Sequence, residues 1–138
     1  MRPLDDVTII DFTQRHAGSV ATMMLAVFGA KVIKVERPDA ADPARAWTPK
    51  KNGHSVYFTY LNRGKESVCV DYATEEGRKI VLELIKKADV VCESLGCGEM
   101  EKYGLDYYRS TIEIVMREVP MFPLSVHGLE TGLKKLMS

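Results

Sequence analysis

The sequence predicts one α/β domain with a Rossmann-like, mostly parallel sheet and flanking helices. Short apolar runs of strand length alternate with segments of helical periodicity through about residue 104. A polar or glycine-rich turn follows each apolar run, which is where ligands bind sheets of this kind. The chain has 138 residues, 46% of them hydrophobic and 28% charged, so it can bury an ordinary core in a single domain.

The first elements are expected to form a strand–helix–strand unit over residues 7–36. Residues 7–12 are an apolar run that indicates a buried parallel strand, and a polar loop follows. Residues 20–28 are apolar on nearly every side, which predicts a buried helix that ends at Gly29. Residues 31–36 carry Val32, Ile33 and Val35 and predict the second strand.

The next stretch gives weaker signals. Residues 37–53 contain three prolines and no period of a strand or helix, so we expect a loop. Residues 56–61 are aromatic and β-branched and fit either a strand or a short helix. Residues 67–71 predict a short strand.

A second clear helix is expected after Thr74. This residue predicts an N-cap because Glu75 and Glu76 follow in the first turn, and apolar residues then recur at helical spacing as far as Ala88. Residues 88–93 predict a third apolar strand, and glycines enclose a short helix around Met100.

Charge and cysteine content limit the partners. Lys plus Arg and Asp plus Glu both total 19, so no net field draws the chain to nucleic acid or to a membrane surface, and neither is an expected partner. Three irregularly spaced cysteines and the absence of a leader-like segment predict a reducing, cytoplasmic location. Cys92 and Cys97 have no further Cys or His cluster beside them, so we expect no metal site.

Four predicted strands end in turns that can hold a ligand. In a parallel sheet these carboxyl ends meet at one edge, and ligands bind in the crevice outside it. The expected site therefore lies at residues 13–19, 36–38, 70–74 and 93–98.

Several blocks spread over about a hundred residues resemble class III (CaiB/BaiF-type) CoA transferases, the family that includes formyl-CoA transferase. Agreement of independent blocks is more specific than one short motif. The blocks are Asp11-Phe12-Thr13 with Ala17-Gly18, Phe28-Gly29-Ala30, residues 32–38, Tyr57-Phe58 with Asn62, Asp71 with Thr74, Glu76-Gly77, and residues 88–90 with Glu93.

The resemblance implies that coenzyme A or an acyl-CoA thioester is the ligand. It places CoA contacts on His16, Ala17, Arg37, Val70, Asp71, Tyr72, Ala73, Ser94, Leu95, Gly96 and Lys102. Arg37 and Lys102 would supply cations for the phosphates. From the residues alone, Arg37 also fits an exposed loop cation, and His16 fits a loop side chain with a satisfied hydrogen bond. The family usually has Gln, Lys, Asn and Arg where His16, Ala73, Ser94 and Lys102 stand.

The resemblance also implies a catalytic Asp that lies beyond the matched region, and no Asp follows Asp106 in this chain. We therefore expect no catalytic residue here. The chain is interpreted as a short or truncated relative, with residues 1–110 as the Rossmann-like CoA-binding portion and residues 111–138 as a divergent tail. Leu129, Leu133 and Leu136 recur at helical spacing, so the tail is expected to be helical.

Two functions fit these observations. The first is a CoA-binding relative of the transferases that binds its ligand without turning it over. The second is a non-catalytic interaction module that pairs with itself or with a full-length CoA transferase. In either case we expect a homo-oligomer or a partner subunit, because the predicted strands are apolar on both faces and two clear helices cover little of them.

Overall fold

The computed structural model describes residues 2–96, 98–105 and the backbone of 121–123. Its main sheet has the order β5-β2-β1-β6-β7, and all neighbouring strands in it are parallel. The strands are β1 (Thr8–Phe12), β2 (Lys31–Glu36), β5 (Glu66–Cys69), β6 (Val90–Glu93) and β7 (Met121–Pro123). A parallel sheet of this order is a Rossmann-like arrangement, as predicted.

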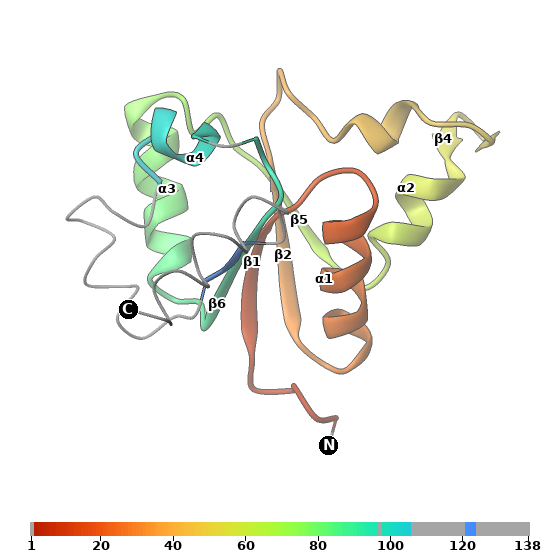
Figure 1. Ribbon diagram of the computed structural model, residues 1–138, viewed down its shortest axis with the longest axis horizontal. Coiled ribbons are helices and arrows are strands. Elements are labelled where there is room, and N and C mark those ends of the chain that lie inside the picture. The colour runs from red at the N-terminus through yellow and green to blue at the C-terminus, as the bar shows by residue number, and fades with distance from the viewer. Residues whose placement is uncertain (1, 97, 106–120, 124–138) are drawn as a thin grey trace, which may run out of the picture.

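Helices cover both faces of this sheet. They are α1 (Ala17–Val27), α2 (Val56–Leu61), α3 (Glu75–Ile85) and α4 (Glu99–Lys102). In Figure 1, α1 and α2 lie on one side of the strands, and α3 and α4 lie on the other. None of the described helices is long and apolar enough to cross a membrane.

Each face of the sheet has its own apolar core, because successive strand residues point to opposite faces. Ile10, Phe12 and Val35 pack with the inner side of α3. Ile9 and Val32 face the other way and pack with alanines at the end of α1. The core on the α1 side is the smaller of the two, and the strand residues beyond it on that face, toward the carboxyl ends, are charged.

Helix α1 differs from its prediction in two respects. It begins at Ala17 rather than at residue 20, and its N-cap His16 makes no side-chain capping bond that the sequence could have signalled. It is also not buried on nearly every side: Met24, Val27 and Phe28 are each about half exposed. Only the side of α1 that faces the sheet and α2 is covered by described residues. The predicted end is confirmed, since Gly29 has a φ of 116°.

The segment predicted as a loop, residues 37–53, contains regular structure. Asp42 caps a short 3-10 helix, Pro43–Ala46, by accepting the Ala44 N–H at 2.9 Å. A small hairpin follows, made of β3 (Lys50–Lys51) and β4 (His54–Ser55). Ser55 then caps α2 by accepting the Phe58 N–H at 3.2 Å, so residues 56–61 adopt the helical alternative.

The second half agrees more closely with the sequence. Thr74 caps α3 as predicted, with its hydroxyl 3.1 Å from the Gly77 nitrogen. The helix ends at Ile85, and the turn that follows leads into β6 at Val90, slightly later than predicted. Apart from the backbone of 121–123, the predicted helical tail lies outside the described residues.

Candidate site at the carboxyl edge of the sheet

The four strand ends that the sequence selected meet at one edge. The chain runs outward from β1 to β2 and β5, and then returns to place β6 on the other flank of β1. The strand order therefore reverses between β1 and β6, which is the position where open α/β sheets bind ligands. The turns after these two strands are bridged directly: Ser94 Oγ accepts the Gln14 N–H at 2.9 Å.

The predicted contacts near this bridge differ in their surroundings. The Ser94 hydroxyl also donates to the Gln14 carbonyl at 3.3 Å, so its one proton is used within the protein. Leu95 is half-buried against the core beneath α3, whereas Gly96 is exposed. His16 is exposed at the start of α1, and Gly18 of that helix packs closely on Thr13.

A buried polar cluster lies under the first turn of α1. Asp11 and Lys34 are cross-strand neighbours in β1 and β2, and both are almost fully buried. Lys65 Nζ reaches in from the turn before β5 and lies 2.8 Å from Asp11 Oδ2 and 2.8 Å from Thr22 Oγ1. Burial lowers the pKa of Lys65, and the adjacent Asp11 carboxylate opposes that shift. The hydroxyl of Ser19 is buried here without a hydrogen-bond partner among the described residues.

Two more ion pairs continue this cluster toward the segment after β2. Lys34 Nζ lies 3.0 Å from Asp42 Oδ2, with both side chains buried. That contact lacks hydrogen-bond geometry, since Asp42 Oδ2 has no hydrogen bond within the described part of the chain, so it is a Coulombic pair. The Arg45 guanidinium donates two hydrogen bonds to the Glu36 carboxylate, of 3.0 and 2.6 Å. Burial raises the pKa of Glu36, but hydrogen bonds from Arg45 and Asp42 outweigh it and leave that pKa lowered.

The sequence pattern does not predict this cluster as a set. One signal was present: Lys34 stands in an apolar strand predicted to be covered on both faces, where a charge needs a partner. The sequence does not identify the partner. The partner of Lys34, Asp42, lies in the segment predicted as a loop. The partner of Asp11, Lys65, is 54 positions away in the chain.

Arg37 directly follows β2, and its side chain is mostly buried. Its guanidinium donates to Asp39 at 2.5 Å and to the Tyr103 hydroxyl, and lies over the Tyr103 ring at 5.0 Å from the centroid. Its Nε is 3.4 Å from Asp71 Oδ1, which is close enough for an ion pair but makes no hydrogen bond. Arg37 is therefore not the free loop cation that its sequence position also allowed.

The predicted contacts at residues 70–73 form the turn between β5 and α3. Tyr72 points inward, packing edge-on against Phe12 and Tyr103 at centroid distances of 5.8 and 5.0 Å. Val70 is half-buried, while Ala73 is exposed and its N–H donates to Asp71 Oδ1 at 3.1 Å. The structure thus brings Arg37, Asp71 and Tyr72 together.

Lys102 is exposed on α4, directly before Tyr103, which contacts Arg37. Its ammonium is paired with Glu99 of the same short helix. At the end of β6, burial raises the pKa of Glu93, although the Leu95 N–H at 2.8 Å opposes the shift. The described residues contain no cluster of His, Cys, Asp or Glu that could hold a metal ion.

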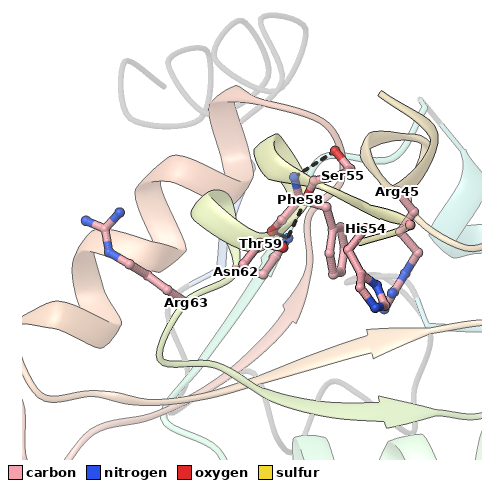
Figure 2. Close-up of a pocket in the computed structure, with 8 residues that line it drawn as sticks. Arg45, His54, Ser55, Phe58, Thr59, Asn62 and Arg63 are labelled. Carbon is pink, nitrogen blue, oxygen red and sulfur yellow. Dashed lines mark hydrogen bonds between the residues drawn. The ribbon is translucent and has the colours of Figure 1, made fainter. Parts of the chain in front are cut away.

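A pocket of about 550 Å³ lies between α2 and the β3–β4 hairpin, and Arg45 is the residue that it shares with the polar cluster. Figure 2 shows its lining: Arg45, Gly53, His54, Ser55, Phe58, Thr59, Asn62 and Arg63. Arg45 stacks on the Phe58 ring at 3.8 Å while it holds Glu36, so its charge is already compensated. None of the predicted ligand contacts lines this pocket, and we assign the candidate site to the sheet edge because the polar strand ends converge there.

Comparison with known proteins identifies the family to which the chain belongs. A profile of CoA-transferase family III matches residues 4–113. Succinyl-CoA:glutarate CoA-transferase of Mus musculus is 44% identical over 108 residues, which are 78% of this chain and 25% of that protein. Formyl-CoA:oxalate CoA-transferase of a Bradyrhizobium species is 41% identical over 107 residues, or 77% of this chain and 25% of that protein. The chain spans about a quarter of the length of these relatives.

Solved structures agree with the sequence matches. A CaiB/BaiF family protein from Brucella suis superposes with a TM-score of 0.74 at 39% identity, over 83% of this chain and 31% of that one. A hypothetical protein from Mycobacterium tuberculosis gives a TM-score of 0.69 at 45% identity, over 77% and 29% of the two chains. These matches confirm both the α/β class and the resemblance found in the sequence, and the chain belongs to CoA-transferase family III.

Proposed function

We propose that residues 1–110 are the CoA-binding portion of a class III CoA transferase and that residues 111–138 are a divergent tail. The observation that carries the proposal is the environment of Arg37. A guanidinium that lies over the rings of both Tyr72 and Tyr103 stands at the carboxyl edge of a parallel sheet, in a chain whose relatives are named for CoA thioesters.

The surroundings of Arg37 suit a phosphate. The planar guanidinium offers several N–H donors in a fixed fork, and phosphate oxygens accept them with charge assistance. Asp39 is the partner that a ligand would displace, because its side chain is 60% exposed while that of Arg37 is 14% exposed. Tyr103 and Asp71 would keep the guanidinium in place during that exchange. The other proposed contacts are His16, Ala17, residues 70–73 and 94–96, and Lys102.

The proposal includes no catalytic residue within these 138 residues. The nucleophilic Asp implied by the family lies beyond the matched region, and no Asp follows Asp106. Without a covalent nucleophile the two-step transfer of CoA has no route, so binding without transfer is expected. The exposed, unbridged Cys69 supports a reducing cytoplasmic location as part of the same proposal.

Calorimetric titration with free CoA tests the binding site. Arg37→Ala should lower the affinity by about 10- to 100-fold, corresponding to a charge-assisted hydrogen-bond contribution of about 1–3 kcal/mol. Arg63→Ala is the matched control, because Arg63 is also a cation stacked on a tyrosine, Tyr60, but lies outside the proposed contacts. Absence of heat with the wild type at millimolar CoA would refute the proposal, as would equal losses in the two variants. Steady CoA transfer to a free carboxylate would refute the non-catalytic part.

A second candidate function rests on exposed apolar side chains. Helices α1 and α2 contact each other, and together they leave several large apolar residues about half exposed. These are Met24, Val27, Phe28, Val56, Tyr57 and Tyr60. Concentrations of exposed apolar residues are typical of surfaces that bind another protein. They favour a homo-oligomer, or a non-catalytic module that pairs with a full-length CoA transferase.

A further inference from the structure

The loop between β1 and α1 is shaped by side chains. The backbone N–H groups of three successive residues, 13–15, each donate to a side-chain oxygen instead of to a backbone carbonyl. The acceptors are Asp11 Oδ1 at 2.8 Å, Ser94 Oγ at 2.9 Å and Asp42 Oδ1 at 2.9 Å. They come from β1, from the end of β6 and from the segment after β2, so three strands fix one loop.

Asp42 has a particular place among these acceptors. It is fully buried, and the Arg15 whose N–H it accepts has a φ of 64°, in the left-handed region that non-glycine residues seldom occupy. A residue stays in that region only where its surroundings determine its conformation. The hydrogen bond from Arg15 to a rigid, buried carboxylate is the contact that meets this need.

Lys34 makes the carboxylate rigid and also contacts the other end of the loop. Its ammonium lies 3.0 Å from Asp42 Oδ2 and donates to the Thr13 carbonyl at 2.6 Å. One buried ion pair therefore holds the loop twice, at the carbonyl of Thr13 through Lys34 and at the N–H of Arg15 through Asp42. Both contacts lie just before the start of α1 at Ala17.

We infer that Asp42 is a positioning residue for the CoA site. Fixed by Lys34, it sets the path of the loop, and so determines where His16 and Ala17 lie at the crevice between β1 and β6. The role in ligand binding rests on the proposed function, whereas the role in fixing the loop does not. Asp42 itself is buried beneath the loop, so it acts on a ligand only through the backbone.

Amide hydrogen exchange of the ligand-free chain tests the loop directly. In Asp42→Ala the Arg15 amide should exchange at least about tenfold faster, because its acceptor is gone. The exchange rate of this amide in Asp42→Asn should lie between those of Asp42→Ala and the wild type, because asparagine keeps an acceptor oxygen but loses the ion pair. Asp42→Asn also provides the test if Asp42→Ala does not fold. Val81→Ala is the matched control for lost stability, because Val81 is fully buried on the opposite face of the sheet.

CoA titration of the same variants tests the consequence for binding. The affinity of Asp42→Ala should fall about tenfold, that of Asp42→Asn by less, and that of Val81→Ala should not change. Arg15 exchange no faster in the Asp42 variants than in Val81→Ala would overturn the inference. A loosened loop with unchanged CoA affinity would overturn the positioning role. If the wild type does not bind CoA, the proposed function fails, and the exchange order alone decides whether Asp42 fixes the loop.

Discussion

Replacing Gly77 with alanine should destabilise the chain, although alanine is the better helix former. A Cβ on Gly77 would lie 2.0 Å from the carbonyl oxygen and 2.6 Å from the carbonyl carbon of Asp71. Carbon atoms pack at about 3.5–4.0 Å, so the turn before α3 would have to move by more than about 1 Å. The Thr74 hydroxyl, 3.0 Å from the same Cβ, would move with it and release its capping bond.

The opposing contributions can be compared. Alanine gains about 0.5–1 kcal/mol over glycine within a helix. Forcing extra volume into a packed site costs about 1–3 kcal/mol, and a lost N-cap costs about 1 kcal/mol. The unfavourable contributions are larger, so Gly77→Ala should lower the free energy of unfolding by about 1–3 kcal/mol.

Urea denaturation at fixed pH measures this change. Ile80→Ala is the control on the same helix, because Ile80 is half exposed and its truncation should change stability by no more than about 0.5 kcal/mol. In heteronuclear NMR, the shifts of residues 70–74 should move in Gly77→Ala and stay unchanged in Ile80→Ala. A Gly77→Ala variant as stable as the wild type, with these shifts unmoved, would refute the close-approach argument.

Two further predictions concern pH and assembly. Burial, together with the neighbouring Asp11 charge, raises the pKa of the Cys92 thiol to about 12 from an ordinary 9.0. As pH rises, the unfolded chain therefore loses this proton before the folded chain does. The free energy of unfolding should fall as pH rises from 9 to 12. Between pH 8.5 and 10.5 the free energy of unfolding should fall by about 2 kcal/mol on account of Cys92. In denaturant titrations at several pH values, Cys92→Ala should lack that decrease. Equal pH dependence of stability in the wild type and Cys92→Ala would contradict the prediction. Sedimentation over a micromolar concentration series should show an oligomer whose population rises with concentration, and Phe28→Ser should weaken it. A single monomeric species with a cooperative melt would contradict the hypothesis of an interaction module.

The sequence predicts the sheet well because its signals there are local. The strand at 31–36 agrees with β2 residue for residue, and the N-cap at Thr74 is visible from the glutamates that follow it. Both depend on residues that are neighbours in the chain. The start of α1 is placed too late because its N-cap, His16, makes no capping bond and the turn before it depends on distant side chains.

The site is predicted only in outline for the same reason. Convergence of the strand ends follows from topology, and the turns holding Arg37 and Tyr72 do meet. The partners of each charge do not follow from topology. From the sequence, Asp39 and Asp71 resemble exposed acids beside a strand, yet in the structure both lie next to Arg37 and pair with its charge. The chain offers no sequence period from which such pairings could be inferred.

The buried charges under α1 matter more for the path of the loop backbone than for the stability of the fold. A buried ion pair is often no more stabilising than apolar residues of the same volume, so the pairs of Lys65 and Lys34 are weak evidence for added stability. Apolar replacements would, however, leave the loop N–H groups at residues 13 and 15 without acceptors, and an unsatisfied buried amide costs about 1–3 kcal/mol. The loop could then keep its path only by exposing those amides to water, which means moving outward from the sheet. Paired charges therefore allow the β1–α1 loop to stay close to the sheet edge. The three pairs, Lys34–Asp42, Lys65–Asp11 and Arg45–Glu36, do so without adding net charge beside the proposed CoA site.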